Sequence, residues 1–97
     1  MLSLQTLPGN FAIYRFAPQA SVPAQVWHSP LLSVTRTPDE LSVVCAADVP
    51  VEGALSCEMD WAALQVAGPL DFSLTGVLAG LSTALAAAGI SVFAVST

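Results

Sequence analysis

The chain has 97 residues, the length of one small domain, and its seven acidic residues outnumber two arginines, giving a formal net charge of −5. This charge would repel the phosphates of nucleic acids and anionic membrane surfaces, so we expect neither as a partner. Hydrophobic residues make up 55% of the chain and charged residues only 9%, and we expect a second chain to cover part of this apolar surface.

The first half of the chain predicts short strands separated by turns. The N-terminus lacks the basic and apolar regions of an export signal, so we expect a cytoplasmic protein. Residues 11–16 (FAIYRF) are predicted to form a strand after a turn at Gly9 and Asn10. Residues 22–27 favour a short helix, because Pro23 can occupy a first helical turn. A second strand is predicted over residues 31–37 (LLSVTRT).

Residues 37–40 (TPDE) have the pattern of a helix start. Thr37 is a suitable N-cap, Pro38 suits the first helical position, and Glu40 completes a capping box. The predicted helix is short, because residues 41–47 (LSVVCAA) already favour a third strand. We expect Arg36 and Asp39, which flank this motif, to form a solvated surface pair.

The second half begins with a loop over residues 49–54, the one plausible internal boundary. A fourth strand is predicted over residues 59–68 (MDWAALQVAG). No charged residue follows Asp71, so the last 26 residues are long enough to cross a bilayer, and Gly76 and Gly80 form a GxxxG pattern.

The periodicity of this last segment argues against a membrane span. Its large apolar residues recur at spacings of three and four, while the opposite helix face carries small residues. This stripe consists of Leu74, Val77, Leu78, Leu81 and Leu85. We therefore predict a helix over about residues 72–88 that ends at Gly89, followed by a strand over residues 90–96. Neither is long enough to span a bilayer.

These elements predict an α+β protein, with an antiparallel sheet that carries its helices on one face. Cys45 and Cys57 lack the spacing of a redox or zinc motif, and we expect two free, mostly buried thiols. His28 has no second histidine or nearby cysteine, so no metal site is predicted. No catalytic triad or phosphate-binding loop can be singled out, and we predict no enzymatic activity and no cofactor.

Two long stretches carry a family resemblance. They are SVTRTPDELSVVC (33–45) and GPLDFSLTGVLAGLSTALAAAGISVFAVST (68–97), with PGNFAIYRF near the start and Trp61, Leu64 and Val66 between them. In this order they resemble small ACT-domain proteins related to the cytosolic arginine sensors of animal nutrient signalling. The resemblance implies two ferredoxin-like ACT units, which we place at residues 1–56 and 57–97, and a ligand site at an interface between units.

One departure from the family concerns the C-terminus. In the family the last strand runs on through an acidic segment into a further strand and helix, whereas this sequence stops at Thr97. We therefore expect the second ACT unit to be incomplete, either as a fragment or as a unit that another molecule completes.

The helix start at residues 71–77 is the candidate ligand site. Free backbone N–H groups and the positive end of a helix dipole suit a carboxylate, and Gly76 would allow its close approach. Asp71 would then meet a ligand ammonium, and Ser73 and Thr75 would donate hydroxyls. In the arginine sensors the corresponding helix start contributes to the pocket, so the resemblance extends the site over Phe72, Leu74 and Val77.

The alternative is that these residues have structural roles, with Asp71 or Ser73 as an N-cap and Gly76 serving helix packing. Two functions from different classes thus remain open. One is a regulatory module that binds a small-molecule ligand, which the family resemblance implies is an amino acid; the other is an interaction module that mediates oligomerisation without a ligand. A homo-oligomer is expected in both cases, because open sheet edges and apolar patches attract partners.

Overall fold

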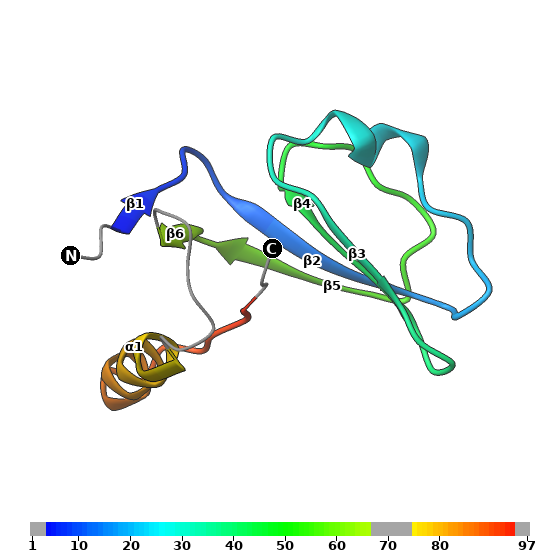
Figure 1. Cartoon of the computed structure of the whole chain (residues 1–97). Helices are drawn as coiled ribbons and strands as arrows, with labels where there is room; N and C mark the ends of the chain where they lie inside the picture. The colour runs from blue at the N-terminus through cyan, green and yellow to red at the C-terminus, as the bar shows by residue number, and fades with distance from the viewer. Residues whose placement is uncertain (1–3, 67–74, 95–97) are drawn as a thin grey trace. The chain divides into compact units, whose positions relative to one another are not determined.

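The computed structural model of the protein describes residues 4–66 and 75–94, which fall into two compact units (Figure 1). We call Leu4–Gln65 the N-terminal unit and the described residues from Val66 onward the C-terminal unit. The element order is β1 (Leu4–Thr6), β2 (Phe11–Phe16), the 3-10 helix η1 (Ala24–His28), β3 (Ser33–Arg36), β4 (Leu41–Ala46), β5 (Ser56–Trp61), β6 (Leu64–Val66) and α1 (Thr75–Ala87). The protein is α+β, as predicted.

An antiparallel sheet in the order β3-β4-β2-β5 organises the N-terminal unit (Figure 1). β2 lies inside it and pairs with β4 from Phe11↔Ala46 to Phe16↔Leu41. Its pairing with β5 shifts register between Phe11 and Ile13. β1 pairs with β6 in a separate two-stranded sheet.

The main core cluster of the N-terminal unit lies on one face of this sheet, while Phe11, Ile13 and Val44 are buried on the other face. Alternate residues of the two inner strands are buried in the main cluster, and Val26 of η1 packs against them with no exposed surface. The strand residues of this core are Ala12, Tyr14, Phe16, Leu41, Val43 and Cys45. Each fully buried leucine or valine contributes about 2 kcal/mol of transfer free energy, so this face holds η1 and its flanking loops on the sheet.

The predicted helix at residues 37–40 is wrong, because this segment is the turn of the β3–β4 hairpin. The Thr37 N–H donates to the Glu40 carbonyl oxygen at 2.9 Å, continuing the ladder beyond the Arg36↔Leu41 pair. The Thr37 hydroxyl oxygen accepts from the N–H groups of Asp39 and Glu40, both at 3.2 Å. The hydroxyl thus does what an N-cap does, but strand pairing on both sides leaves no room for a helical turn.

Arg36 does not pair with Asp39 as predicted. Its Nε donates to the carbonyl oxygen of Pro18 at 2.9 Å, and its Nη2 donates to the carbonyl oxygen of Ala20. The planar guanidinium presents several donors in a fixed fork, so one side chain can donate to both carbonyl oxygens at once. Arg36 therefore ties the loop between β2 and η1 to strand β3.

The predicted fourth strand over residues 59–68 is also a misassignment. Residues 59–61 belong to β5, which pairs with β2, and residues 64–66 form β6, which pairs with β1. Ala62 and Ala63 between them are not strand residues, and residues 67 and 68 lie outside the described residues. Asp60 has a φ of 66°, a left-handed conformation that interrupts a regular strand. The sequence analysis missed β1, the partner of β6, because the polar residues and turn formers near the N-terminus obscure a strand pattern.

Helix α1 confirms the prediction over residues 75–87, whereas residues 72–74 lie outside the described residues. Gly89 has a φ of 75°. Its N–H donates to the carbonyl oxygen of Ala86, and the N–H of Ile90 donates to the carbonyl oxygen of Leu85 at 2.9 Å. These two hydrogen bonds form a Schellman motif, so Gly89 ends the helix as predicted. Leu81 and Leu85 of the predicted stripe are half-buried. Of the helices in the described residues, none combines the length and apolar character that a membrane span requires.

The predicted last strand is wrong for residues 90–94, which form no regular structure. Residues 95 and 96 lie outside the described residues. A strand requires a neighbour to complete its backbone hydrogen bonds, and none of the described strands pairs with this segment. High β-propensity alone does not provide that neighbour.

Candidate ligand-binding site

Most of the predicted ligand site lies outside the described residues, namely Asp71, Phe72, Ser73 and Leu74. Thr75, Gly76 and Val77 are the first three residues of α1, and no acidic residue stands in this first described turn. The assignment of residues 71–77 as a ligand site therefore stays a prediction.

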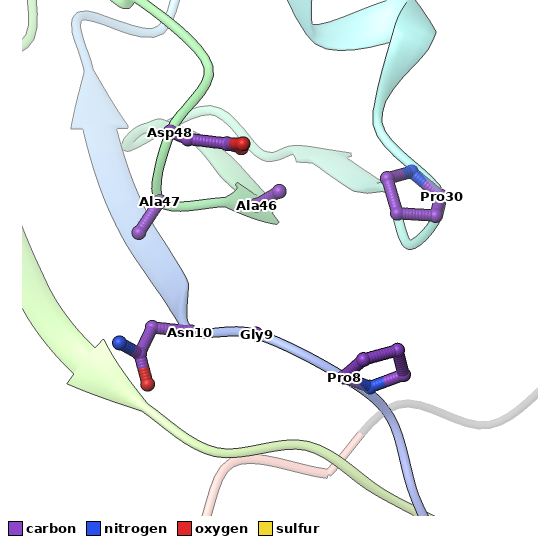
Figure 2. A pocket seen from close by; sticks show the side chains of 7 residues that line it. All are labelled: Pro8, Gly9, Asn10, Pro30, Ala46, Ala47 and Asp48. Atoms are coloured by element: carbon purple, nitrogen blue, oxygen red, sulfur yellow. The ribbon is translucent and has the colours of Figure 1, made fainter.

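The N-terminal unit contains a hollow of about 300 Å³ that the sequence analysis did not predict (Figure 2). Three connections enclose it: the loop before β2, the loop after η1 and the turn after β4. The lining residues are Pro8, Gly9, Asn10, Pro30, Ala46, Ala47 and Asp48. A smaller hollow of about 70 Å³, lined by Leu7, Pro8, Phe11, Pro30 and Leu31, shares both prolines with it. We call the two together the proline hollow.

Hydrogen bonds fix the walls of the proline hollow. The Ala47 N–H donates to the Asn10 carbonyl oxygen at 2.9 Å, which joins the turn after β4 to the loop before β2. The Ser29 hydroxyl accepts from the Ala46 N–H at 2.9 Å and donates to the Leu31 carbonyl oxygen at 2.6 Å. Pro8 and Pro30 have fixed φ angles, so the hollow is formed before any ligand arrives.

Among the described residues, Asp48 is the only charged one that lines the proline hollow. It lies in a turn closed by a hydrogen bond from the Val49 N–H to the Ala46 carbonyl oxygen at 3.1 Å. Figure 2 shows its side chain extending from this turn into the space on the Pro30 side, whereas the Asn10 side chain points away from Pro8 and Pro30. The hollow therefore combines apolar wall residues with one carboxylate.

The two thiols lie in different environments. Both are free, as predicted, but Cys45 is buried and Cys57 is exposed, so the prediction of two mostly buried thiols fails for Cys57. Cys57 is on the edge strand β5, where its Sγ donates to the Met59 Sδ at 3.2 Å. Burial raises the pKa of the Cys45 thiol, and the nearby Cys57 and Asp48 raise it further.

Tyr14 is the other titratable group of the core whose pKa is shifted. Burial raises the pKa of its phenol above the ordinary value of 10.0, and Cys57 and Cys45 add to this rise. A raised pKa keeps both Tyr14 and Cys45 protonated at neutral pH, so neither is prepared to act as a nucleophile. In the part of the chain that the structure describes, no three His, Cys, Asp or Glu residues are placed to hold a metal ion.

Comparisons with known proteins show which family the chain belongs to. Residues 56–97 match the family model described as an ACT domain, and residues 9–51 match a model described as an N-terminal domain. The crystal structure of Protein Atu0741 from Agobacterium tumefaciens is 32% identical, with a TM-score of 0.87, over 99% of this chain and 71% of that chain. None of the curated proteins compared with the chain matches it.

The protein therefore belongs to the same family as Protein Atu0741, and its residues 56–97 match the ACT domain. Its α+β structure fits the ferredoxin-like ACT fold that the sequence predicted. ACT domains are generally regulatory modules rather than catalytic ones, and they typically bind small-molecule ligands and oligomerise. The more specific relation to arginine sensors stays a prediction, as does the division at residues 56 and 57.

No sequence pattern predicts the proline hollow. Pro8, Gly9 and Pro30 indicate turns, and Asp48 is a common turn residue. What brings these turns together is the pairing of β2 with β4, which places Phe11 opposite Ala46. The alternation of both strands predicts that each exists, but it does not say which strands are neighbours or in what register.

Proposed function

We propose that the protein is a regulatory ACT-domain module that binds a small amino acid at the start of helix α1. The observation that carries this proposal is the match of residues 56–97 to the ACT domain family. The proposed site, residues 71–77, lies within the matched segment and includes the first three residues of α1. In this proposal residues 1–56 and 57–97 are two ACT-like units of a cytoplasmic protein.

The chemistry of the proposed site suits a zwitterion. A helix of 13 residues has a positive dipole end at its N-terminus, where backbone N–H groups would receive the ligand carboxylate. Asp71 would receive the ammonium, and Ser73 and Thr75 would add hydroxyl donors. Gly76 carries no side chain that would block the approach of the ligand.

A screen of thermal stability tests this function. A ligand that binds only the folded protein at 100 times its dissociation constant stabilises it by about 2.7 kcal/mol. We expect at least one common amino acid to raise the melting temperature, whereas the matching acid without the amine has a smaller effect. Arginine belongs in the screen because of the resemblance to arginine sensors. If no amino acid raises the melting temperature, the proposal fails.

The second candidate function is an interaction module without a ligand, which one observation favours. β5 is an edge strand of the four-stranded sheet, and Met59 on it is 47% exposed while Leu55 just before it is 75% exposed. An exposed edge with apolar side chains attracts another strand. On this alternative the protein forms a homo-oligomer in solution while no amino acid changes its melting temperature.

A further inference from the structure

The proline hollow combines two features that favour one class of ligand. The smaller hollow has mainly apolar walls, with Leu7 and Leu31 lining it, and it shares Pro8 and Pro30 with the larger hollow, whose lining is mixed. Of the lining residues that the structure describes, Asp48 alone is charged. A ligand that fills both hollows must therefore offer a compact apolar group and a positive charge.

The chain itself supplies no cation to Asp48 within the described residues. It has two arginines and one histidine. No ion pair joins His28 to Asp48 among the described residues, and both arginines are engaged elsewhere. Arg15 Nε lies 3.4 Å from the Glu40 carboxylate, and the Arg36 guanidinium donates to the carbonyl oxygens of Pro18 and Ala20. Glu40 and Arg36 flank the turn at one end of β4, whereas Asp48 follows the other end of the strand.

We infer that the proline hollow is a second binding site, which takes a small organic ammonium compound with a compact apolar group. The ammonium meets the Asp48 carboxylate, and the apolar group lies between Pro8 and Pro30. The net charge of −5 attracts cations and repels anions at long range. The described residues that line the proline hollow all belong to the N-terminal unit, so the hollow shares none of them with residues 71–77.

The walls explain why the ligand is small and why binding is weak. Hydrogen bonds from Ala46 and Ala47 hold two sides of the hollow, so it can accept a ligand without rearranging. Asp48 is exposed, and an ion pair in water adds little affinity. For a primary amine with five carbons we expect a dissociation constant on the order of 1 mM.

The test is a titration of the ¹⁵N-labelled full chain with 3-methylbutan-1-amine, followed by NMR. We expect shifts at the amides of Gly9, Ala47 and Asp48. The neutral alcohol of the same shape, 3-methylbutan-1-ol, is expected to bind several times more weakly, and 3-methylbutanoate not at all. Added salt should weaken binding of the amine but not of the alcohol.

Matched variants separate this site from a general effect of charge. Asp48→Asn keeps a turn-forming residue and the shape of the hollow while removing the charge. It should lower the affinity for the amine about fivefold or more. Asp39→Asn removes the same charge from the turn at the other end of β4 and should leave the affinity unchanged. The spectrum of each variant reports directly whether it is folded.

Three results would overturn the inference. The first is an equal affinity for the amine and the alcohol. The second is an Asp48→Asn variant that binds the amine with the affinity of the original protein. The third is a set of amide chemical-shift changes confined to residues 75–77. An amine that binds here while amino acids fail to bind the protein would leave this site standing and would remove only the proposed regulatory function.

Discussion

Arg36 Nε donates a hydrogen bond of 2.9 Å to the carbonyl oxygen of Pro18, 18 residues earlier in the chain. Its Nη2 donates to Ala20, a residue that is partly buried against the core. The loop between β2 and η1 is thus held on strand β3 by one side chain. This loop carries the chain to Val26, which fills the centre of the core.

Replacing Arg36 should loosen this loop. Arg36→Lys keeps the charge but loses the planar fork, so it cannot donate to both carbonyls in the same geometry. We expect the free energy of unfolding to fall by about 1 kcal/mol, measured by urea denaturation. The control is Arg15→Lys, which alters only an exposed ion pair and should cost less than about 0.5 kcal/mol. Equal losses in the two variants would contradict the role assigned to Arg36.

The hydroxyl of Thr37 should stabilise the β3–β4 hairpin. Thr37→Val keeps the shape of the side chain but removes the oxygen that accepts from the N–H groups of Asp39 and Glu40. We expect a loss of about 1 kcal/mol in the free energy of unfolding, whereas Thr37→Ser should retain most of the stability. If Thr37→Ser loses as much as Thr37→Val, the hydroxyl is not the stabilising group.

Sequence patterns predict correctly the elements that depend on neighbouring residues alone, such as a helix end, and the strands in which apolar and polar residues alternate clearly. Residues 11–16 form a strand with the predicted bounds, and Gly89 ends α1 where predicted. The TPDE motif at residues 37–40 predicts a helix start, which is wrong, because the hydrogen bonds from a hydroxyl to backbone N–H groups are shared by helix starts and turns. Only the pairing of β3 with β4 decides between the two.

Features that depend on distant partners were not predicted. β1 forms with β6, about 60 residues later in the chain, and residues 90–94 have strand-like composition without a described partner strand. Asp48 became a candidate site residue only once the pairing of β2 with β4 had brought Pro8 near it and the hydrogen bond from Ala46 to Ser29 had brought Pro30 near it. Of the predicted ligand site, the structure places only Thr75, Gly76 and Val77, at the start of α1.

Stability should decline at alkaline pH because of Tyr14 and Cys45. Burial raises the pKa of the phenol above 10.0 and that of the thiol above 9.0, so the unfolded chain loses these protons at lower pH than the folded protein. The folded state is then the one that binds more protons, and the free energy of unfolding falls as pH rises through and beyond this range. Urea denaturation between pH 7 and pH 11 should show this fall.

Tyr14→Phe supplies the control for the pH dependence. It removes the phenol while keeping the ring in the core, so the decline above pH 10 should become shallower. Below pH 8 the slope of the free energy of unfolding against pH should be the same in the variant and the original protein, because neither Tyr14 nor Cys45 titrates there. A decline above pH 10 that is identical in the two proteins would show that Tyr14 does not cause it.

The two thiols should react at very different rates in the folded protein. Cys57 is exposed, whereas Cys45 has no exposed surface and a raised pKa, and only the thiolate is nucleophilic. With a thiol-reactive disulfide reagent at pH 8, we expect one thiol to react rapidly and the second only in denaturant. Cys57→Ser should abolish the rapid reaction, and a rapid phase that survives this substitution would contradict the assigned environments.

The central claim is that residues 71–77 bind an amino acid, and calorimetry on two glycine variants tests it most directly. Gly76→Val places a branched side chain at the proposed site, while Gly80→Val places the same side chain one helical turn later, where a new Cβ meets no atom within 4 Å. The ligand is the amino acid that stabilises the original protein most, and circular dichroism checks that both variants fold. We predict that Gly80→Val binds it with its affinity unchanged and that Gly76→Val gives no heat of binding; full affinity in a folded Gly76→Val would contradict the claim.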